Sequence, residues 1–312
     1  MLSFISARRA HQSAAPRAPH FALMVLVALS MLLAACAPSA TNDPVLALRI
    51  NGTPITLSSY QQVLALFDAS AALQGSGTSG PLAWQSPNDR QTWTSAKSQT
   101  LNFFTSTTVI KQELDRQHLT VNQKDIDAAV AQLNAQIANA RAQSQSNPAN
   151  AGLKALVEAA TPDAIRLLAE QEAYTLVLAD KASAPTVKAH GILVNSQAEA
   201  NSLLASLKSG GDFAALAKQH SLDTTSGANG GDLGTVYVGQ FVPAFDTQIF
   251  RKMQGNGYAV VALGSGYGVF SISGRGATPL SDLKNPQTQQ QYAGSWINNV
   301  LVPEARVENY VA

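Results

Sequence analysis

Hydrophobic and polar positions first predict a short strand and then a series of helices. Residues 46–50 read Leu-Ala-Leu-Arg-Ile, and the Asn-Gly pair at 51–52 predicts a turn that closes this strand. Apolar residues then recur at helical spacing, and Asn122 and Thr161 stand where helix caps are expected. The predicted helices cover about 56–73, 92–117, 123–142 and 161–182. Residues 74–91, rich in Gly, Ser and Pro, predict a loop.

The pattern changes at Ala184-Pro185, where a linker is predicted. Beyond it, β-type and helical patterns alternate over short distances. The predicted elements are strands over 188–194, 259–263 and 268–273, helices over about 197–208, 212–219 and 242–250, and a glycine-rich segment over 227–234. These elements are typical of a small α+β module of about 90 residues. A last helix is predicted from Asn285-Pro286 onward, with Trp296 on its apolar face.

The N-terminus has the features of an export signal. Residues 1–20 carry three arginines and no acid, and residues 21–35 form a hydrophobic stretch too short for the roughly 20 residues of a membrane span. The stretch ends Leu-Ala-Ala-Cys, which resembles the lipobox of bacterial lipoproteins. Cys36 is therefore predicted to be lipidated, which would tether the protein to a bacterial membrane on its extracytoplasmic side. The alternatives are an ordinary signal peptide with a chance cysteine, or an uncleaved anchor.

Composition narrows the classes of function. Lys plus Arg is 21 and Asp plus Glu is 20, so the chain lacks the basic surplus of a nucleic-acid-binding protein. Hydrophobic residues make up 46% and charged residues 13%, which argues against a wholly disordered chain. One cysteine excludes an internal disulfide and a multi-thiolate zinc site. No phosphate loop, dinucleotide fingerprint or nucleophile elbow is found, and no cofactor or metal is implied.

Five ordered blocks in the second half resemble the parvulin-type (rotamase, PpiC) peptidyl-prolyl isomerases. The blocks are Ile-Leu-Val at 192–194, Asp-Phe-Ala-Ala-Leu-Ala at 212–217, Gly-Gly-Asp-Leu-Gly at 230–234, Gly-Gln-Phe-Val-Pro-Ala-Phe at 239–245 and Gly-Tyr at 266–267. The match covers about 188–275, and the flanking segments resemble those of SurA-like and PrsA-like foldases. The resemblance implies an α+β protein: a mostly helical SurA-like N-terminal domain, completed by a C-terminal helix, plus a small parvulin-like α+β isomerase domain.

The expected domain organisation follows from the pattern and the resemblance together. The expected segments are a lipoprotein signal peptide (1–35), a tether (36–45), a helical chaperone-like domain (46–182), a parvulin-like isomerase domain (183–278) and a C-terminal helix packing on the helical domain (279–312).

The resemblance also implies the residues of a proline-binding socket. Rotation about an X–Pro bond has a barrier of about 18–20 kcal/mol, and an enzyme lowers it by favouring the twisted amide over either planar form. By position, Leu233, Phe241 and Phe245 match the residues that form the family's socket, and Gln240 lies beside them. Packing in an ordinary hydrophobic core is the alternative role for each apolar residue.

The polar part of the family's site departs from the pattern. Most active parvulins carry two facing histidines, and Gly191 and Gly268 stand at those positions. His190 is displaced by one residue, which turns a strand side chain to the opposite face unless a bulge at Gly191 returns it. Thr224 takes the polar position ahead of the glycine-rich loop, and Asp223 is expected to cap a turn there. Thr224 and His190 are the candidate catalytic residues.

The function predicted first is a membrane-anchored extracytoplasmic peptidyl-prolyl cis-trans isomerase and foldase. Its expected partners are unfolded or newly exported polypeptides with X–Pro segments, and the membrane through the lipid anchor. The alternative is a parvulin-like chaperone that is weakly active or inactive and only binds such segments. A solute-binding lipoprotein is disfavoured because the chain shows no run of alternating β and α units.

Overall fold

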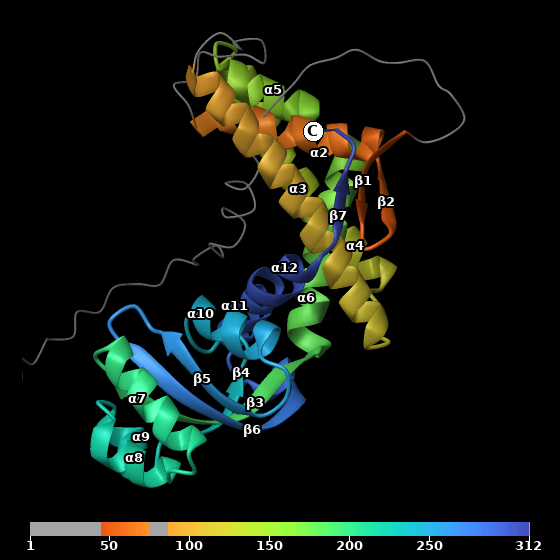
Figure 1. Cartoon of the computed structure of the whole chain (residues 1–312). Coiled ribbons are helices and arrows are strands. Elements are labelled where there is room, and N and C mark those ends of the chain that lie inside the picture. The colour runs from red at the N-terminus through yellow and green to blue at the C-terminus, as the bar shows by residue number, and fades with distance from the viewer. Residues whose placement is uncertain (1–44, 75–86, 312) are drawn as a thin grey trace, which may run out of the picture.

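The computed structural model describes residues 45–74 and 87–311, and Figure 1 shows a helical region joined to a smaller α+β region. The predicted signal peptide, Cys36, the tether and most of the predicted 74–91 loop lie outside the described residues. In the part of the chain that is described, no helix is both long enough and apolar enough to cross a bilayer. The α+β class, with a helical domain completed by C-terminal helices, is confirmed.

Five helices build the first region. They are α2 (Leu57–Gln74), α3 (Pro87–Arg116), α4 (Gln123–Ser146), α5 (Ala151–Ala159) and α6 (Pro162–Lys181). Their apolar faces meet in one core that includes Tyr60, Phe104 and Leu156. Thr161 caps α6 as predicted, through a 3.2 Å hydrogen bond from the Ala164 amide. Asn122 stands at the start of α4, but its side chain bonds Asp125 instead of a backbone amide.

A small sheet lies beside these helices and joins the two ends of the described chain. Its order is β2–β1–β7, with β1 (Leu46–Ile50), β2 (Thr53–Thr56) and β7 (Val307–Asn309). Asn51 and Gly52 both have positive φ, which lets β1 and β2 form a tight hairpin. The pattern did not predict β2, which contains a proline, nor β7, which is three residues long.

The α+β region is a four-stranded antiparallel sheet with helices on both faces. Its strand order is β4–β3–β6–β5. The strands are β3 (Ser183–Val194), β4 (Asp232–Tyr237), β5 (Gly257–Ala262) and β6 (Tyr267–Pro279). The helices are α7 (Gln197–Lys208), α8 (Phe213–His220), α9 (Thr224–Ala228) and α10 (Pro243–Asp246), which continues as a wider helical turn over Thr247–Lys252. Helices α7 and α8 cover one face and α10 the other.

The C-terminal segment packs back on the first region. Helix α11 (Pro286–Trp296) begins with Asn285 as its cap and runs into a short turn and α12 (Val302–Glu304). Trp296 is buried with Ile110 of α3, Leu178 of α6 and Val238 of the loop after β4. The two regions therefore share one hydrophobic cluster where they meet.

A buried carboxylate reinforces this junction. Asp246 is fully buried at the end of α10, and it accepts hydrogen bonds from the Gly239 amide at 3.0 Å and from Asn299 Nδ2 at 2.8 Å. Burial raises the pKa of Asp246, and these two hydrogen bonds act in the opposite direction. The loop that precedes Phe241 is thus tied to the C-terminal segment.

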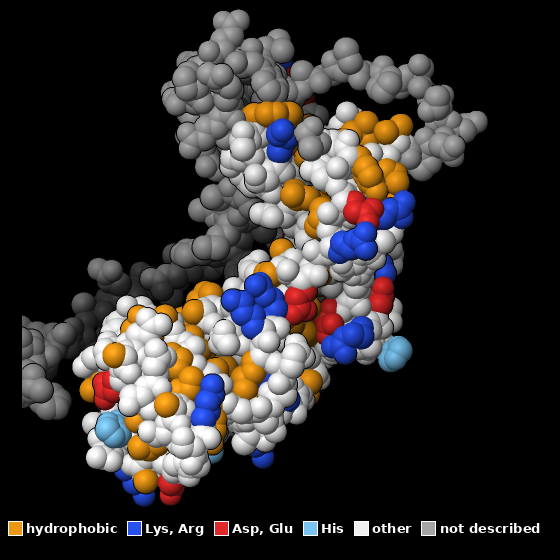
Figure 2. Space-filling view, in the orientation of Figure 1, with side chains coloured by type: hydrophobic (Ala, Val, Ile, Leu, Met, Phe, Trp, Pro, Cys, Tyr) orange, Lys and Arg blue, Asp and Glu red, His pale blue; other side chains and the backbone are white. Residues whose placement is uncertain are grey.

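The molecular surface carries no dominant charged face in the view of Figure 2. Hydrophobic side chains lie in small separate patches over both regions, with Lys, Arg, Asp and Glu between them. This interleaving agrees with the near-zero formal charge of +1. The concave sites of the molecule are therefore the more informative places to look for function.

Candidate functional site

A small apolar pocket lies on the face of the sheet that α10 covers. Its volume is about 120 Å³. It is lined by Gly191, Ile192, Leu193, Asp223, Ser226, Leu233, Phe241, Leu263, Gly268 and Phe270. Most of its side chains are hydrophobic, so a ligand entering it exchanges water for apolar contacts.

Two of the three predicted socket side chains line this pocket. Leu233 is the second residue of β4, and Phe241 follows the loop after β4 with 36% of its surface exposed. Phe245 does not line the pocket because it is fully buried beneath Phe241, with their ring centroids 5.0 Å apart. Phe241 is therefore an accessible wall of the pocket, whereas Phe245 supports that wall from the core.

Gln240 lies outside the pocket. Its side-chain Oε1 accepts a 3.1 Å hydrogen bond from the backbone amide of Tyr237, and the rest of the residue is exposed. This bond closes the loop between β4 and Phe241. In this structure Gln240 shapes the segment that carries Phe241 and makes no direct contact with the pocket.

The geometry at the edge of the pocket explains why the glycine-rich block needs glycine at position 231. The Gly191 amide donates a 2.7 Å hydrogen bond to the Gly231 carbonyl, so the loop lies directly against β3. Gly231 has φ +79°, and a Cβ there would stand 2.6 Å from the Gly191 carbonyl oxygen. Only glycine fits both conditions. The Gly-Gly-Asp-Leu-Gly block thereby delivers Leu233 to the pocket.

The two candidate catalytic residues lie outside the pocket. The ring of His190 faces α8, with its centroid 5.9 Å from that of Phe213, because strand alternation sends it to the face opposite Gly191. The register of β3 shifts before His190, and this shift does not return the ring to the pocket. Thr224 is exposed in the first turn of α9.

Asp223 and Ser226 instead form the polar edge of the pocket. Asp223 caps α9 as expected, accepting from the amides of Thr225 and Ser226, and its Oδ2 accepts a 2.5 Å hydrogen bond from Ser226 Oγ. The Ser226 hydroxyl, together with these amides, holds the pKa of Asp223 below its usual value. The sequence predicted the cap, but the Asp-x-x-Ser spacing is a local signal and did not place Asp223 and Ser226 at the pocket.

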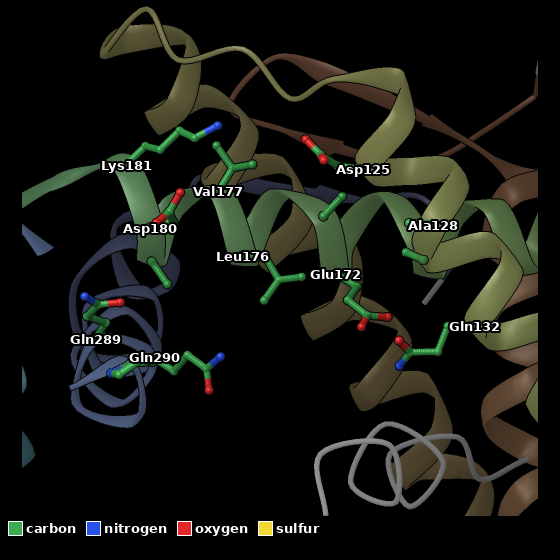
Figure 3. Close-up of a pocket in the computed structure, with 14 residues that line it drawn as sticks. Asp125, Ala128, Gln132, Glu172, Leu176, Val177, Asp180, Lys181, Gln289 and Gln290 are labelled. Carbon is green, nitrogen blue, oxygen red and sulfur yellow. The ribbon is translucent and has the colours of Figure 1, made fainter. Parts of the chain in front are cut away.

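A second, larger groove lies in the helical region between α4, α6 and α11 (Figure 3). Its volume is about 420 Å³. Its lining is half polar and half apolar, with Leu176 and Val177 among the apolar residues. The polar residues are Asp125, Gln132, Glu172, Asp180, Lys181, Gln289 and Gln290.

Glu172 is the unusual residue of this groove. In Figure 3 it projects from α6 toward Gln132 of α4. Its Oε2 atom is buried without a hydrogen-bond partner among the described residues, and burial raises the pKa of Glu172. The groove therefore contains an unused hydrogen-bonding atom, in contrast to the apolar pocket on the sheet.

Comparison with known proteins identifies the α+β region. The family model of the PPIC-type PPIASE domain matches residues 176–275. The chain is 25% identical over 268 residues to the foldase protein PrsA of Caldanaerobacter subterraneus subsp. tengcongensis, an alignment that covers 85% of this chain and 84% of that protein. It is 34% identical over 102 residues to the foldase protein PrsA 2 of Bacillus anthracis, covering 32% of this chain and 36% of that protein.

A solved structure gives a further comparison. The crystal structure of foldase protein PrsA from Streptococcus pneumoniae aligns over 88% of this chain and 89% of that chain, with 19% identity and a TM-score of 0.32. The residues matched by the family model include all five sequence blocks and every residue that lines the pocket. Residues 176–275 therefore form a parvulin-type (PPIC-type) peptidyl-prolyl isomerase domain, in a chain that is similar to the PrsA foldases.

Proposed function

We propose that the protein is a membrane-anchored extracytoplasmic peptidyl-prolyl isomerase that assists the folding of exported proteins. The observation that carries this proposal is the apolar pocket between Leu233, Phe241 and Phe270, at the position of the family's proline socket. We further propose that residues 46–182 and 279–312 form the body of the foldase, and residues 183–278 the isomerase domain. The names of the PrsA relatives support the foldase role.

The pocket is suited to catalysis without a nucleophile. A proline ring held against Leu233 and Phe241 leaves the peptide bond before it at the pocket's mouth. Twisting that bond breaks amide resonance and makes the group less polar, so a site that excludes water favours the twisted form. Asp223 and Ser226 stand at the polar edge, where an amide group of the substrate has hydrogen-bonding partners.

The anchor is proposed from the sequence of the N-terminus. Lipid attached to Cys36 would hold the protein at the membrane, since each buried CH₂ group contributes about 0.8 kcal/mol. Cys36→Ser is expected to move the protein from the membrane fraction to the soluble fraction and to remove the lipid mass from its N-terminal peptide. Wild-type protein without lipid at Cys36 would contradict the anchor and leave the isomerase proposal standing.

The isomerase proposal is tested by NMR exchange on a set of X–Pro peptides, with the full chain purified in mild detergent. We expect faster cis–trans exchange with wild-type protein, and about a tenfold lower rate with Phe241→Ala because the ring loses an apolar wall. Leu222→Ala, which truncates an exposed hydrophobic side chain that does not line the pocket, serves as the control. Exchange at the uncatalysed rate with wild-type protein would contradict the enzyme reading.

The second candidate is a chaperone that binds but does not isomerise. Two observations favour it: glycine stands at both family histidine positions, and the helical region carries a groove with polar and apolar lining. Under this reading the protein suppresses aggregation of an unfolded client while prolyl exchange stays at background. The two assays on one preparation therefore separate the candidates.

A further inference from the structure

One aromatic ring fills the space beside both glycines that replace the family's histidines. Gly191 lies opposite Phe270 in the β3–β6 register, and Gly268 is two residues before Phe270 on the same strand. All three positions therefore share one face of the sheet. A Cβ added at Gly268 would stand 2.6 Å from Phe270 Cζ, and one added at Gly191 would stand 3.2 Å from Phe270 Cε1.

The ring of Phe270 is held firmly in this place. Only 4% of the residue is exposed, and its ring meets Phe245 edge to face, with centroids 4.9 Å apart and an interplanar angle of 79°. Phe241 also lies near this ring, at a centroid distance of 6.3 Å. Any side chain at position 268 must displace this ring, because there is no free space for a Cβ atom.

We propose that Phe270 sets the size of the proline socket in this protein. Its ring can occupy this place because positions 191 and 268 are glycine and have no side chain there. This inference rests on the proposed isomerase function. Phe270 contributes apolar surface to a pocket of about 120 Å³ in which both glycines supply only backbone. The ring thus acts as a specificity-determining residue: it closes space that a larger cyclic residue than proline would need.

Ring-size selectivity tests the proposal. Proline has a five-membered ring, and pipecolic acid adds one methylene, a difference that an apolar pocket discriminates by about 10–200-fold. NMR exchange and titration with matched X–Pro and X–pipecolyl peptides give both the exchange rate and the Kd for the full chain. Wild-type protein is expected to prefer the prolyl peptide.

Phe270→Ala is expected to raise the ratio of the pipecolyl exchange rate to the prolyl exchange rate by about tenfold, since it opens room for one more methylene. Phe250→Ala is the matched control: it removes a ring of the same cluster that packs on Phe245 but does not line the pocket. This control is expected to leave the ratio unchanged. An unchanged ratio in Phe270→Ala, with prolyl binding or exchange still measurable, would overturn the inference while leaving the proposed function intact.

A second arm tests the packing and needs no substrate. Gly268→Ala is expected to lower the Tm, and Gly268→Ala combined with Phe270→Leu to recover at least half of the loss, because the smaller side chain yields the space. Gly274→Ala on the same strand, where a Cβ meets only ordinary contacts with Lys188, should leave the Tm unchanged. A Gly268→Ala variant as stable as wild type would overturn the claim that Phe270 excludes side chains there. Wild-type protein that neither binds nor isomerises either peptide would overturn the proposed function, and the ring-size role with it.

Discussion

The concave surfaces of the two regions differ in the share of polar side chains that line them. In the α+β region, hydrophobic side chains and glycine backbone over the sheet form a pocket of about 120 Å³. In the helical region, a groove of about 420 Å³ is lined by carboxylates, amides and a lysine together with an equal number of apolar residues. The first surface suits a single ring stripped of water, whereas the second offers hydrogen bonds to a longer segment of chain. Under the proposed function, the two surfaces would therefore contact a polypeptide in two different ways.

Buried carboxyl groups have different surroundings at the junction of the two regions and in the helical core. At the junction, Asp246 is buried but accepts hydrogen bonds from Gly239 and Asn299. In the helical core, Asp68 on α2 is 1% exposed and its Oδ2 has no hydrogen-bond partner among the described residues. Burial raises the pKa of Asp68 to about 9, so this carboxyl group is protonated near neutral pH. Among the described residues, buried carboxyl oxygens without a hydrogen-bond partner therefore occur only in the helical region, at Asp68 and Glu172.

The largest expected effect is a difference in stability between variants of Phe245, which supports the wall of the pocket, and Phe241, which forms it. Phe245→Ala should lower the free energy of unfolding by about 3–5 kcal/mol, because it empties a fully buried aromatic site. Phe241→Ala should cost about 1 kcal/mol or less, since that ring is partly exposed. Urea unfolding of both variants measures the difference. Equal losses would mean that Phe241 belongs to the core and that the pocket has no distinct wall.

The next effect is a dependence of stability on pH that arises in the helical core. Asp68 has a folded pKa of about 9, above the ordinary value of 3.8, so the folded state holds a proton that the unfolded state has lost between these values. Its contribution to stability is therefore fully present below about pH 4 and decreases as pH rises toward 9. The slope is at most about 1.4 kcal/mol per pH unit.

Asp68→Asn tests this dependence because the amide is neutral at every pH in the window. Urea unfolding from pH 5 to pH 8 should show wild-type protein losing stability relative to Asp68→Asn as pH rises. Asp127→Asn, an exposed acid on α4, is the control that should follow the wild-type trend. A constant difference between wild type and Asp68→Asn would show that Asp68 does not titrate in the folded protein over this range.

A smaller effect tests the division of labour between the two surfaces. Leu176 lines the groove with 46% of its surface exposed, and Leu222 in the α+β region is similarly exposed but lines neither surface. Leu176→Asn should weaken suppression of client aggregation by about threefold through loss of one apolar contact. Leu222→Asn should leave it unchanged, and neither variant should alter prolyl exchange. If Leu176→Asn also lowered the rate of prolyl exchange, the two surfaces would not act independently.

The smallest expected effects concern the residues first selected for catalysis. His190→Ala and Thr224→Ala should change prolyl exchange by about twofold or less, because neither side chain lines the pocket. Asp223→Asn, at the polar edge, provides the contrast and should lower the rate further than either. If His190→Ala strongly lowered the rate of prolyl exchange without lowering stability, His190 would have a role in catalysis.

Local signals predicted much of the fold. The Thr161-Pro162 and Asn285-Pro286 pairs each mark a helix start, and α7 covers the residues expected of it. Elements that depend on distant partners were missed: β4 begins inside the glycine-rich segment and becomes a strand by pairing with β3. The predicted strand from 188 also begins earlier, at Ser183, because β6 pairs with its whole length.

The candidate site was predictable only in part, for a related reason. Two of the family blocks identified Leu233 and Phe241, both of which line the pocket. Phe270 was not predicted because an aromatic residue within a strand usually belongs to the core. Its importance comes from the β3–β6 register, which sets it opposite Gly191. A large aromatic two residues after a glycine at a site position is the signal that would have pointed to it.

The pairing of β7 with β1 has a consequence for the order in which the chain assembles. The first described strand has β7 as one of its two neighbours, and Asn51 exchanges hydrogen bonds of 2.8 Å with Arg306. The α+β region, by contrast, is continuous in sequence and makes its sheet from its own residues. During synthesis the α+β region can therefore fold while the helical region is still incomplete. The β2–β1–β7 sheet is completed last, when β7 pairs with β1.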